Sequence, residues 1–266
     1  MKISLVISDV DSTLITPEHE ITNRAKNAVE SLREKKIKFT IASSRPPRGL
    51  TAFAEQLQII EPFAAFNGAI IQNVDGKVLM NHLLEREISE KAFEVSRKFN
   101  LGLWVYCEKD WFVSKVTNFV AREQETVGFD AIIENDLEKT FENVAKLVIV
   151  GNPEIVAEAE TVISQELGDK VSATKSKPRF LDITSKDAHK GTVVTQLSEV
   201  LRIPTSEIAV IGDGLNDVLM FEKAGFSIAM GQAIDAVKKS ANLITTSNTE
   251  NGFATAIENF IIPAQF

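Results

Sequence analysis

Short apolar runs, each the length of one β-strand, alternate with amphipathic helical patterns at both ends of the chain. The first run is Ile3–Ile7, and Ile208–Ile211 near the other end is as apolar. A helical pattern follows the first run, with Thr22 as its N-cap and an apolar face formed by Ala25, Ala28, Val29 and Leu32. Because parallel strands need crossover helices, this alternation predicts a Rossmann-like, doubly wound parallel sheet with helices on both faces.

The middle of the chain has a different character, with strands that carry aromatic side chains. Two of these strands are expected at Leu103–Tyr106 and Trp111–Val113. Strands and helices follow one another here in an α+β order, which predicts a separate sheet. We therefore expect residues 1–82 and 187–266 to form one discontinuous α/β domain, and residues 83–186 to form an inserted α+β domain.

The composition limits the partners and the location of the protein. The 29 Lys and Arg residues against 37 Asp and Glu leave a net charge of −8, and no basic run exceeds two residues. This argues against a nucleic-acid partner. No apolar stretch approaches the roughly 20 residues of a membrane span, and the single Cys107 excludes an internal disulfide. We expect a cytoplasmic protein with no membrane partner.

An acidic protein that binds an anionic substrate needs a local positive charge, for which a metal ion is a ready source. The three histidines, His19, His82 and His189, are scattered in the sequence and cannot form a zinc site with one Cys. Oxygen ligands would favour Mg²⁺.

Two carboxylates follow the first apolar run directly, in the segment Asp9–Thr13. Ligands of open parallel sheets bind beyond the carboxyl ends of the strands. Two carboxylates at that edge repel each other, so they share a cation or one is protonated. Asp9 can then act as a nucleophile and Asp11 as an acid/base group, although the segment alone also fits a turn. A calcium-binding loop is excluded, because Leu14 stands where that loop requires Gly.

A second oxygen-rich segment, Gly212–Asp217, follows the apolar run near the other end. Its glycines allow sharp turns close to a ligand, and Asp213, Asn216 and Asp217 supply oxygens. Alone it also fits a capped helix start. Two acidic clusters at the ends of two buried strands would converge on one rim of the sheet, which predicts a site for a hard cation.

Two further positions suit an oxyanion such as phosphate. Ser43 and Arg45 follow the expected strand Lys38–Ala42, and Lys190 precedes a helix, where the helix dipole opposes a cation. Taken singly, Ser43 fits a helix cap and Lys190 an exposed, solvated side chain. Together, a nucleophile, a hydroxyl, a cation and a metal cluster predict phosphoryl transfer.

These segments, in this order, resemble the four motifs of the haloacid-dehalogenase-like phosphatases: Asp9–Thr13, Ser43, Lys190 and Gly212–Asp217. The insertion between the second and third motifs resembles the large cap of the Cof-type subfamily, and the resemblance extends over the whole chain. In this sequence Ser12 stands in place of a more usual Gly, and Ser43–Arg45 in place of a more usual Thr-Gly-Arg.

The resemblance implies a role for each matching residue. Asp9 would attack phosphorus and become an aspartyl-phosphate, while Asp11 would protonate the leaving oxygen and then activate water. Phosphate or substrate binding is implied for Ser43, Arg45, Asn67, Gly68, Lys190 and Asn216. A Mg²⁺ site is implied for Asp9, Asp11 through its backbone carbonyl, Asp213 and Asp217.

The resulting expectation is a magnesium-dependent phosphatase that acts on small phosphorylated metabolites, with sugar phosphates as the favoured class. Two alternatives remain: a phosphomutase of the phosphomannomutase type, and a non-hydrolytic phospho-acceptor or regulatory protein. The inserted domain would select the substrate. Its candidate contact residues are Trp104, Tyr106, Trp111 and Arg179, although core packing is the better expectation for the aromatic ones.

Overall fold

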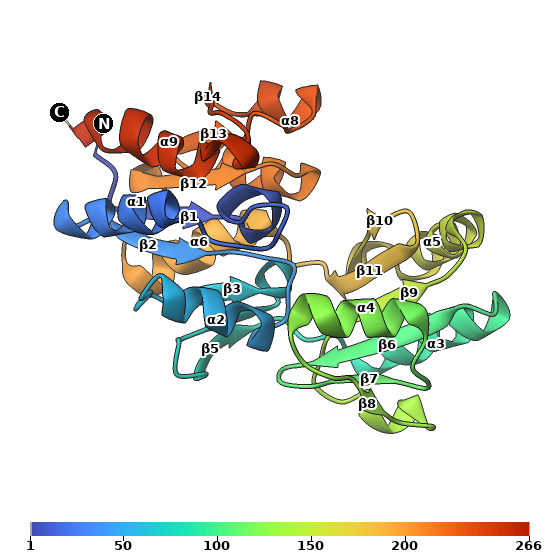
Figure 1. The fold of residues 1–266 in the computed structure, drawn as a ribbon. Coiled ribbons are helices and arrows are strands. Elements are labelled where there is room, and N and C mark those ends of the chain that lie inside the picture. Colours follow the sequence, from blue (N-terminus) through green and yellow to red (C-terminus); the bar gives the residue numbers. More distant parts are fainter. Residues whose placement is uncertain (1, 266) are drawn as a thin grey trace.

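The two ends of the chain meet in one parallel sheet in the computed structural model, which describes residues 2–265 (Figure 1). The strand order is β14-β13-β12-β1-β2, and all neighbours are parallel. The strands are β1 (Leu5–Ser8), β2 (Lys38–Ile41), β12 (Ile208–Gly212), β13 (Phe226–Ala229) and β14 (Leu243–Ile244). Since β1 pairs directly with β12, segments about 200 residues apart end side by side.

Helices cover both faces of this sheet because successive strand residues alternate between two apolar cores. Val6 packs on one face with α1 and α9, while Leu5 and Ile7 pack on the other with α6, α7 and α8. Thr22 caps α1 as expected, since its hydroxyl accepts a hydrogen bond from the Ala25 amide at 3.1 Å. The helices are α1 (Asn23–Glu34), α2 (Arg48–Gln56), α6 (Lys190–Leu201), α7 (Val218–Lys223), α8 (Asp235–Ser240) and α9 (Gly252–Ala256). The predicted doubly wound α/β fold is confirmed.

A small antiparallel sheet follows α2 and has the order β3-β4-β5. Its strands are β3 (Phe63–Ala65), β4 (Ile70–Gln72) and β5 (Val78–Asn81). It adjoins the parallel sheet at an isolated bridge between Ala42 and Ala64.

The middle of the chain forms its own six-stranded sheet of order β10-β11-β9-β6-β7-β8, drawn from green to yellow in Figure 1. Its strands are β6 (Gly102–Cys107), β7 (Trp111–Val113), β8 (Ile132–Ile133), β9 (Val144–Val150), β10 (Val171–Lys177) and β11 (Phe180–Ser185). Its helices are α3 (Arg86–Lys98), α4 (Asn118–Val127) and α5 (Pro153–Leu167). All these elements lie within residues 83–186, here called the inserted region.

The two faces of the six-stranded sheet have different neighbours. One face packs against α3 and α5 in an apolar core of its own. The other carries Trp104, Tyr106 and Trp111, which are at most 4% exposed and share a core with Phe66 of the parallel-sheet part. Tyr106 and Trp111 stack in parallel, with ring centroids 5.1 Å apart. This second face of the inserted region therefore faces the parallel sheet.

Within residues 2–265, no helix combines the length and the apolar character that crossing a bilayer requires.

Candidate active site

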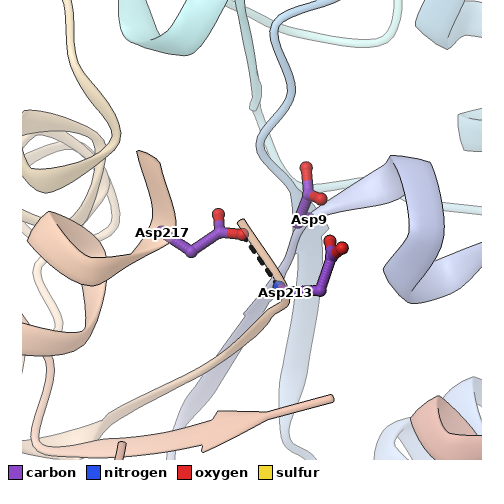
Figure 2. A group of neighbouring side chains, drawn as sticks. All are labelled: Asp9, Asp213 and Asp217. Atoms are coloured by element: carbon purple, nitrogen blue, oxygen red, sulfur yellow. Dashed lines mark hydrogen bonds between the residues drawn. The ribbon is translucent and has the colours of Figure 1, made fainter. Parts of the chain in front are cut away.

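Three carboxylates meet where β1 and β12 end (Figure 2). Asp9 follows β1 directly and Asp213 follows β12, while Asp217 lies just before α7. The backbone amide of Asp9 donates to the carbonyl of Ile211 at 2.9 Å, which ties the two strand ends together. Each carboxylate offers one oxygen within 4.8 Å of the others. The convergence of the two acidic segments follows from the parallel pairing of their strands.

Lys190 joins two of these carboxylates from the first turn of α6. Its Nζ lies 2.6 Å from Asp9 Oδ1 and 2.6 Å from Asp217 Oδ1, and the side chain is 1% exposed. Burial lowers the pKa of Lys190, but the two carboxylates more than offset this and raise it above its ordinary value. The lysine is therefore protonated, and its charge at a helix N-terminus is balanced by the two carboxylates. Removing Lys190 would leave two buried carboxylates without their cationic partner, and leaving a buried charge unpaired costs about 3–5 kcal/mol.

Negative charge is in excess at this site. Burial first, and then the charge of Asp217, raise the pKa of Asp9 well above its ordinary value against the opposing effect of Lys190. Burial and Asp217 likewise raise the pKa of Asp213 to about 6, although Thr13 donates a hydrogen bond to it at 3.1 Å. Three carboxylates facing one ammonium can accommodate a divalent cation, and an oxygen-only donor set fits a hard ion. The Asp triad therefore fits a metal of the type expected from the sequence.

The glycines of the second segment allow the backbone to fold tightly around Asp217. A Cβ at Gly212 would lie 2.4 Å from Asp217 Cγ. The amides of Asp213 and Gly214 donate to Asp217 Oδ2 at 3.0 and 2.9 Å, while Lys190 occupies Oδ1. Asp217 thus holds both the loop and the lysine, a role that the sequence pattern did not distinguish from cation binding.

Arg45 has a different partner from the one expected. Arg45 Nε lies 2.9 Å from Asp11 Oδ2, and Arg45 Nη2 lies 2.7 Å from Oδ1. The sequence prediction placed Arg45 on phosphate, whereas its guanidinium here grips the carboxylate of Asp11. Ser12 follows Asp11 directly and has φ 60°. This is the left-handed region of backbone conformation, which favours glycine and explains why Gly is usual at this position.

The remaining predicted phosphate-binding residues are divided between the cavity and the packing around it. Asn67 and Asn216 both line the cavity, and Asn216 Nδ2 donates to Asn67 Oδ1 at 3.3 Å. Ser43 is 1% exposed, and its hydroxyl accepts a hydrogen bond from the Arg45 amide at 3.1 Å. The neighbouring Ser44, not Ser43, lines the cavity. Gly68 has φ 102° and packs against α6, where a Cβ would lie 2.7 Å from Val193 Cγ2.

A cavity of about 610 Å³ lies between the carboxylate cluster and the inserted region. Asp9, Asp11, Lys190 and Asp213 form its catalytic end. Strands β10 and β11 form the opposite wall, with the polar residues Ser172, Thr174, Lys175, Ser176, Asp182 and Thr184. A second cavity of about 400 Å³ adjoins it and shares Asp11, Ser44, Ser176 and Asp182 with it.

Sequence reasoning missed this polar wall. It selected Trp104, Tyr106, Trp111 and Arg179. Of these, Trp104 lines the second cavity, Tyr106 and Trp111 belong to the core, and Arg179 lies over the ring of Phe119 outside both cavities. The signal was the alternation of Ser172, Thr174 and Ser176, which places three hydroxyls on one face of a strand. The alternation alone does not reveal which face meets the catalytic end.

The comparisons with known proteins agree with this fold. The sequence model of the haloacid dehalogenase-like hydrolase family matches residues 6–257, and the chain belongs to this family. The Bacillus subtilis protein YxeH is 28% identical over 268 residues, which cover 97% of this chain and 98% of YxeH. YcsE of the same organism, which is named a 5-amino-6-(5-phospho-D-ribitylamino)uracil phosphatase, is 24% identical over 261 residues, which cover 98% of this chain and 96% of YcsE.

Solved structures match over nearly the whole chain. A haloacid dehalogenase-like hydrolase from Bacteroides thetaiotaomicron superposes with a TM-score of 0.89 and 28% identity, covering 97% of this chain and 99% of its own. The subclass IIB sugar phosphatase BT4131 superposes with a TM-score of 0.84 and 22% identity, covering 97% and 99%. The expectation of a phosphatase with the haloacid-dehalogenase fold is thereby confirmed.

Proposed function

We propose that the protein is a Mg²⁺-dependent phosphatase that hydrolyses small phosphorylated metabolites, with sugar phosphates as the favoured class, through an aspartyl-phosphate on Asp9. The observation that carries this proposal is the contact of Lys190 with Asp9 at 2.6 Å inside the Asp triad, at one end of a cavity large enough for a small metabolite. The sugar phosphatase BT4131 and the ribitylaminouracil phosphatase YcsE support the choice of a small hydroxylated phosphate ester.

The nucleophile would be Oδ2 of Asp9, the oxygen that Lys190 does not contact. Lys190 holds Oδ1, which leaves Oδ2 to attack phosphorus as the bond to the leaving oxygen breaks. Asp11 gives its proton to that oxygen, so the leaving group departs as an alcohol. Asp11 then takes a proton from water, whose oxygen attacks phosphorus and releases Asp9 and inorganic phosphate.

Asp9, Asp213 and the backbone carbonyl of Asp11 would hold the metal ion, with Asp217 beside them. The bound cation supplies positive charge that lets an anionic nucleophile approach an anionic phosphate. Lys190 contributes a second positive charge at the same carboxylate of Asp9. Asn67 and Asn216, which line the cavity, would contact phosphoryl oxygens.

We further propose that residues 83–186 act as a cap that selects the leaving group. All strands of the six-stranded sheet lie inside these bounds, and β10 and β11 form the wall opposite the carboxylates. The lysine on that wall, Lys175, is paired with Glu160 at 2.6 Å. Because Glu160 balances the charge of Lys175, this lysine would bind the second phosphate of a sugar bisphosphate only weakly. This supports hydrolysis over the phosphomutase alternative.

The test is a screen of purified protein with Mg²⁺ against sugar phosphates, alditol phosphates, nucleotides and cofactor phosphates, measuring inorganic phosphate. Release of phosphate without a bisphosphate activator is expected. An isomerised sugar phosphate formed only in the presence of bisphosphate would instead identify a phosphomutase, and phosphorylation of Asp9 without turnover would identify a phospho-acceptor.

A further inference from the structure

A lysine and an aspartate that the proposed chemistry does not use are buried together in the six-stranded sheet. Lys146 on β9 and Asp182 on β11 are each 6% exposed, and Nζ lies 3.5 Å from Asp182 Oδ2. Charged side chains are rarely buried unless they are paired, and a buried pair adds little net stability compared with apolar residues. A pair that contributes little to stability but lies beside a substrate cavity is a candidate for a role in binding.

The pair lies on the face of the sheet that meets the parallel-sheet part. Lys146 Nζ donates to the carbonyl of Ser44 at 3.2 Å, so the side chain crosses from the inserted region to the segment beside Asp11. The same ammonium lies 4.9 Å from the ring centroid of Tyr106 and 5.4 Å from that of Phe66. These contacts fix Lys146, and Lys146 in turn fixes the position of Asp182 relative to the catalytic end.

Asp182 lines both cavities and retains acceptor capacity there. Ser176 Oγ donates to Oδ1 at 3.1 Å, and Lys146 approaches Oδ2. A carboxylate can accept about four hydrogen bonds, so these two partners leave room for donors from a bound molecule. The shared cavity also contains Asp9 and Asp11, which places such a molecule against the reacting phosphate.

The surroundings of Asp182 define the chemistry of that molecule. Hydroxyls of Ser172, Thr174 and Thr184 line the same wall. Lys146 balances the charge of Asp182, and Glu160 balances that of Lys175. In the larger cavity, a wall of acceptors and hydroxyls with paired charges matches a neutral group that carries several hydroxyls.

We propose that Asp182 is a specificity-determining residue that accepts hydrogen bonds from hydroxyls of the leaving group, and that Lys146 is a positioning residue that holds it. This inference rests on the proposed phosphatase function. Because the contact lies away from the reacting bond, it contributes equally to the ground state and the transition state. Its loss therefore raises KM and leaves kcat unchanged.

The experiment compares the best substrate among hexose 6-phosphates and pentitol 5-phosphates with cyclohexylmethyl phosphate, which keeps a ring and a primary phosphate but has no hydroxyls. For Asp182→Asn we expect KM for the hydroxylated ester to rise roughly 10- to 100-fold, the effect of a lost hydrogen bond to a charged group. The kcat for that ester and the kcat/KM for cyclohexylmethyl phosphate stay within about twofold. The matched control is Asp136→Asn, because Asp136 is an exposed carboxylate of the inserted region that is paired with Lys139 outside both cavities. Asp136→Asn is expected to leave KM and kcat for both esters unchanged.

A double variant tests the proposal if Asp182→Asn fails to fold with Lys146 left unpaired. Lys146→Met with Asp182→Asn removes both charges, and the same loss of preference for the hydroxylated ester is expected. Equal effects on the two esters, or no effect on either, would overturn the proposal. Wild-type protein that hydrolyses both esters without preference would overturn it while the phosphatase function stands. Wild-type protein that releases phosphate from no ester with Mg²⁺ would overturn both.

Discussion

The guanidinium of Arg45 grips both carboxylate oxygens of Asp11, with Nη2 2.7 Å from Oδ1 and Nε 2.9 Å from Oδ2. The same guanidinium donates through Nη1 to the carbonyl of Thr126 at 3.0 Å, near the end of α4 in the inserted region. Arg45 is 7% exposed, whereas the Asp11 side chain is 42% exposed. Because the planar guanidinium binds both Asp11 and the carbonyl of Thr126, it fixes the plane of the Asp11 carboxylate and links its position to that of the inserted region.

This relationship predicts that Arg45→Lys impairs the acid role of Asp11, because a lysine cannot form the bidentate contact. For an alkyl phosphate, whose leaving oxygen needs a proton, we expect kcat/KM to fall roughly 10- to 100-fold. For p-nitrophenyl phosphate, whose leaving group needs no proton, kcat/KM falls less than about threefold, because kcat/KM covers only the steps up to departure of the leaving group and not the later attack of water. Steady-state kinetics on the two esters measures the difference.

The neighbouring Arg48→Lys is the control. Arg48 contacts Asp110 at 3.5 Å and the ring of Phe129, and has no contact with Asp11. It is expected to leave the ratio between the two esters unchanged. If Arg45→Lys lowers kcat/KM equally for both esters, Arg45 acts on the phosphate itself, as the sequence prediction had it.

The second prediction concerns the nucleophile. Asp9→Asn is expected to lower kcat at least about 1,000-fold, because an amide cannot attack phosphorus. Burial raises the pKa of Asp9, so its charge costs stability, and Lys190 keeps Asp217 as a partner in the variant. The thermal midpoint is therefore expected to be equal to that of the wild type or higher. Mass spectrometry must exclude deamidation of the introduced amide. Wild-type turnover by the intact Asp9→Asn variant would remove Asp9 as the nucleophile.

The third prediction is that activity depends on Mg²⁺ and on Asp213. Chelation with EDTA should abolish phosphate release, and added Mg²⁺ should restore it. Asp213→Asn should raise the Mg²⁺ concentration for half-maximal activity by at least about 10-fold, since altering even the partners of a ligand has effects of that size. Asp235→Asn, an exposed aspartate on α8, serves as the control. Undiminished activity in EDTA would contradict the metal assignment.

The fourth prediction uses the single thiol. Burial, and then the charges of Asp110 and Glu108, raise the pKa of Cys107 from 9.0 to about 11. At pH 8 iodoacetamide should therefore alkylate Cys107 roughly 100-fold more slowly in the folded protein than in urea, since the thiolate is the nucleophile. Because the folded state holds this proton more tightly, the contribution of Cys107 to stability is complete below pH 9 and declines as the pH rises toward 11. If the alkylation rate of the folded protein reached half of its maximum at pH 9 or below, the raised pKa of Cys107 would be refuted.

Much of the catalytic end could be predicted from local patterns. Apolar runs separated by amphipathic helices specify a parallel sheet, and parallel strands present their carboxyl ends on one edge. Asp9 and Asp213 each follow such a run, so the parallel pairing of β1 with β12 in the observed register brings them together. Lys190 at the start of a helix is opposed by the helix dipole, but taken singly it fitted an exposed, solvated side chain; the structure instead places two carboxylates 2.6 Å from its Nζ.

The partner of Arg45 and the role of Asp182 could not be predicted in this way. Arg45 has a long side chain that can reach either a phosphate or Asp11, and the choice depends on how α4 packs beside it. Asp182 lies among strands of the inserted region, and its neighbours depend on strand pairing and on which face of that sheet meets the parallel one. Local periodicity therefore determines the elements and the residues at their ends. Contacts such as those of Arg45 with Asp11 and of Lys146 with Asp182 depend on the docking of whole elements, where burial, charge pairing and side-chain shape act together.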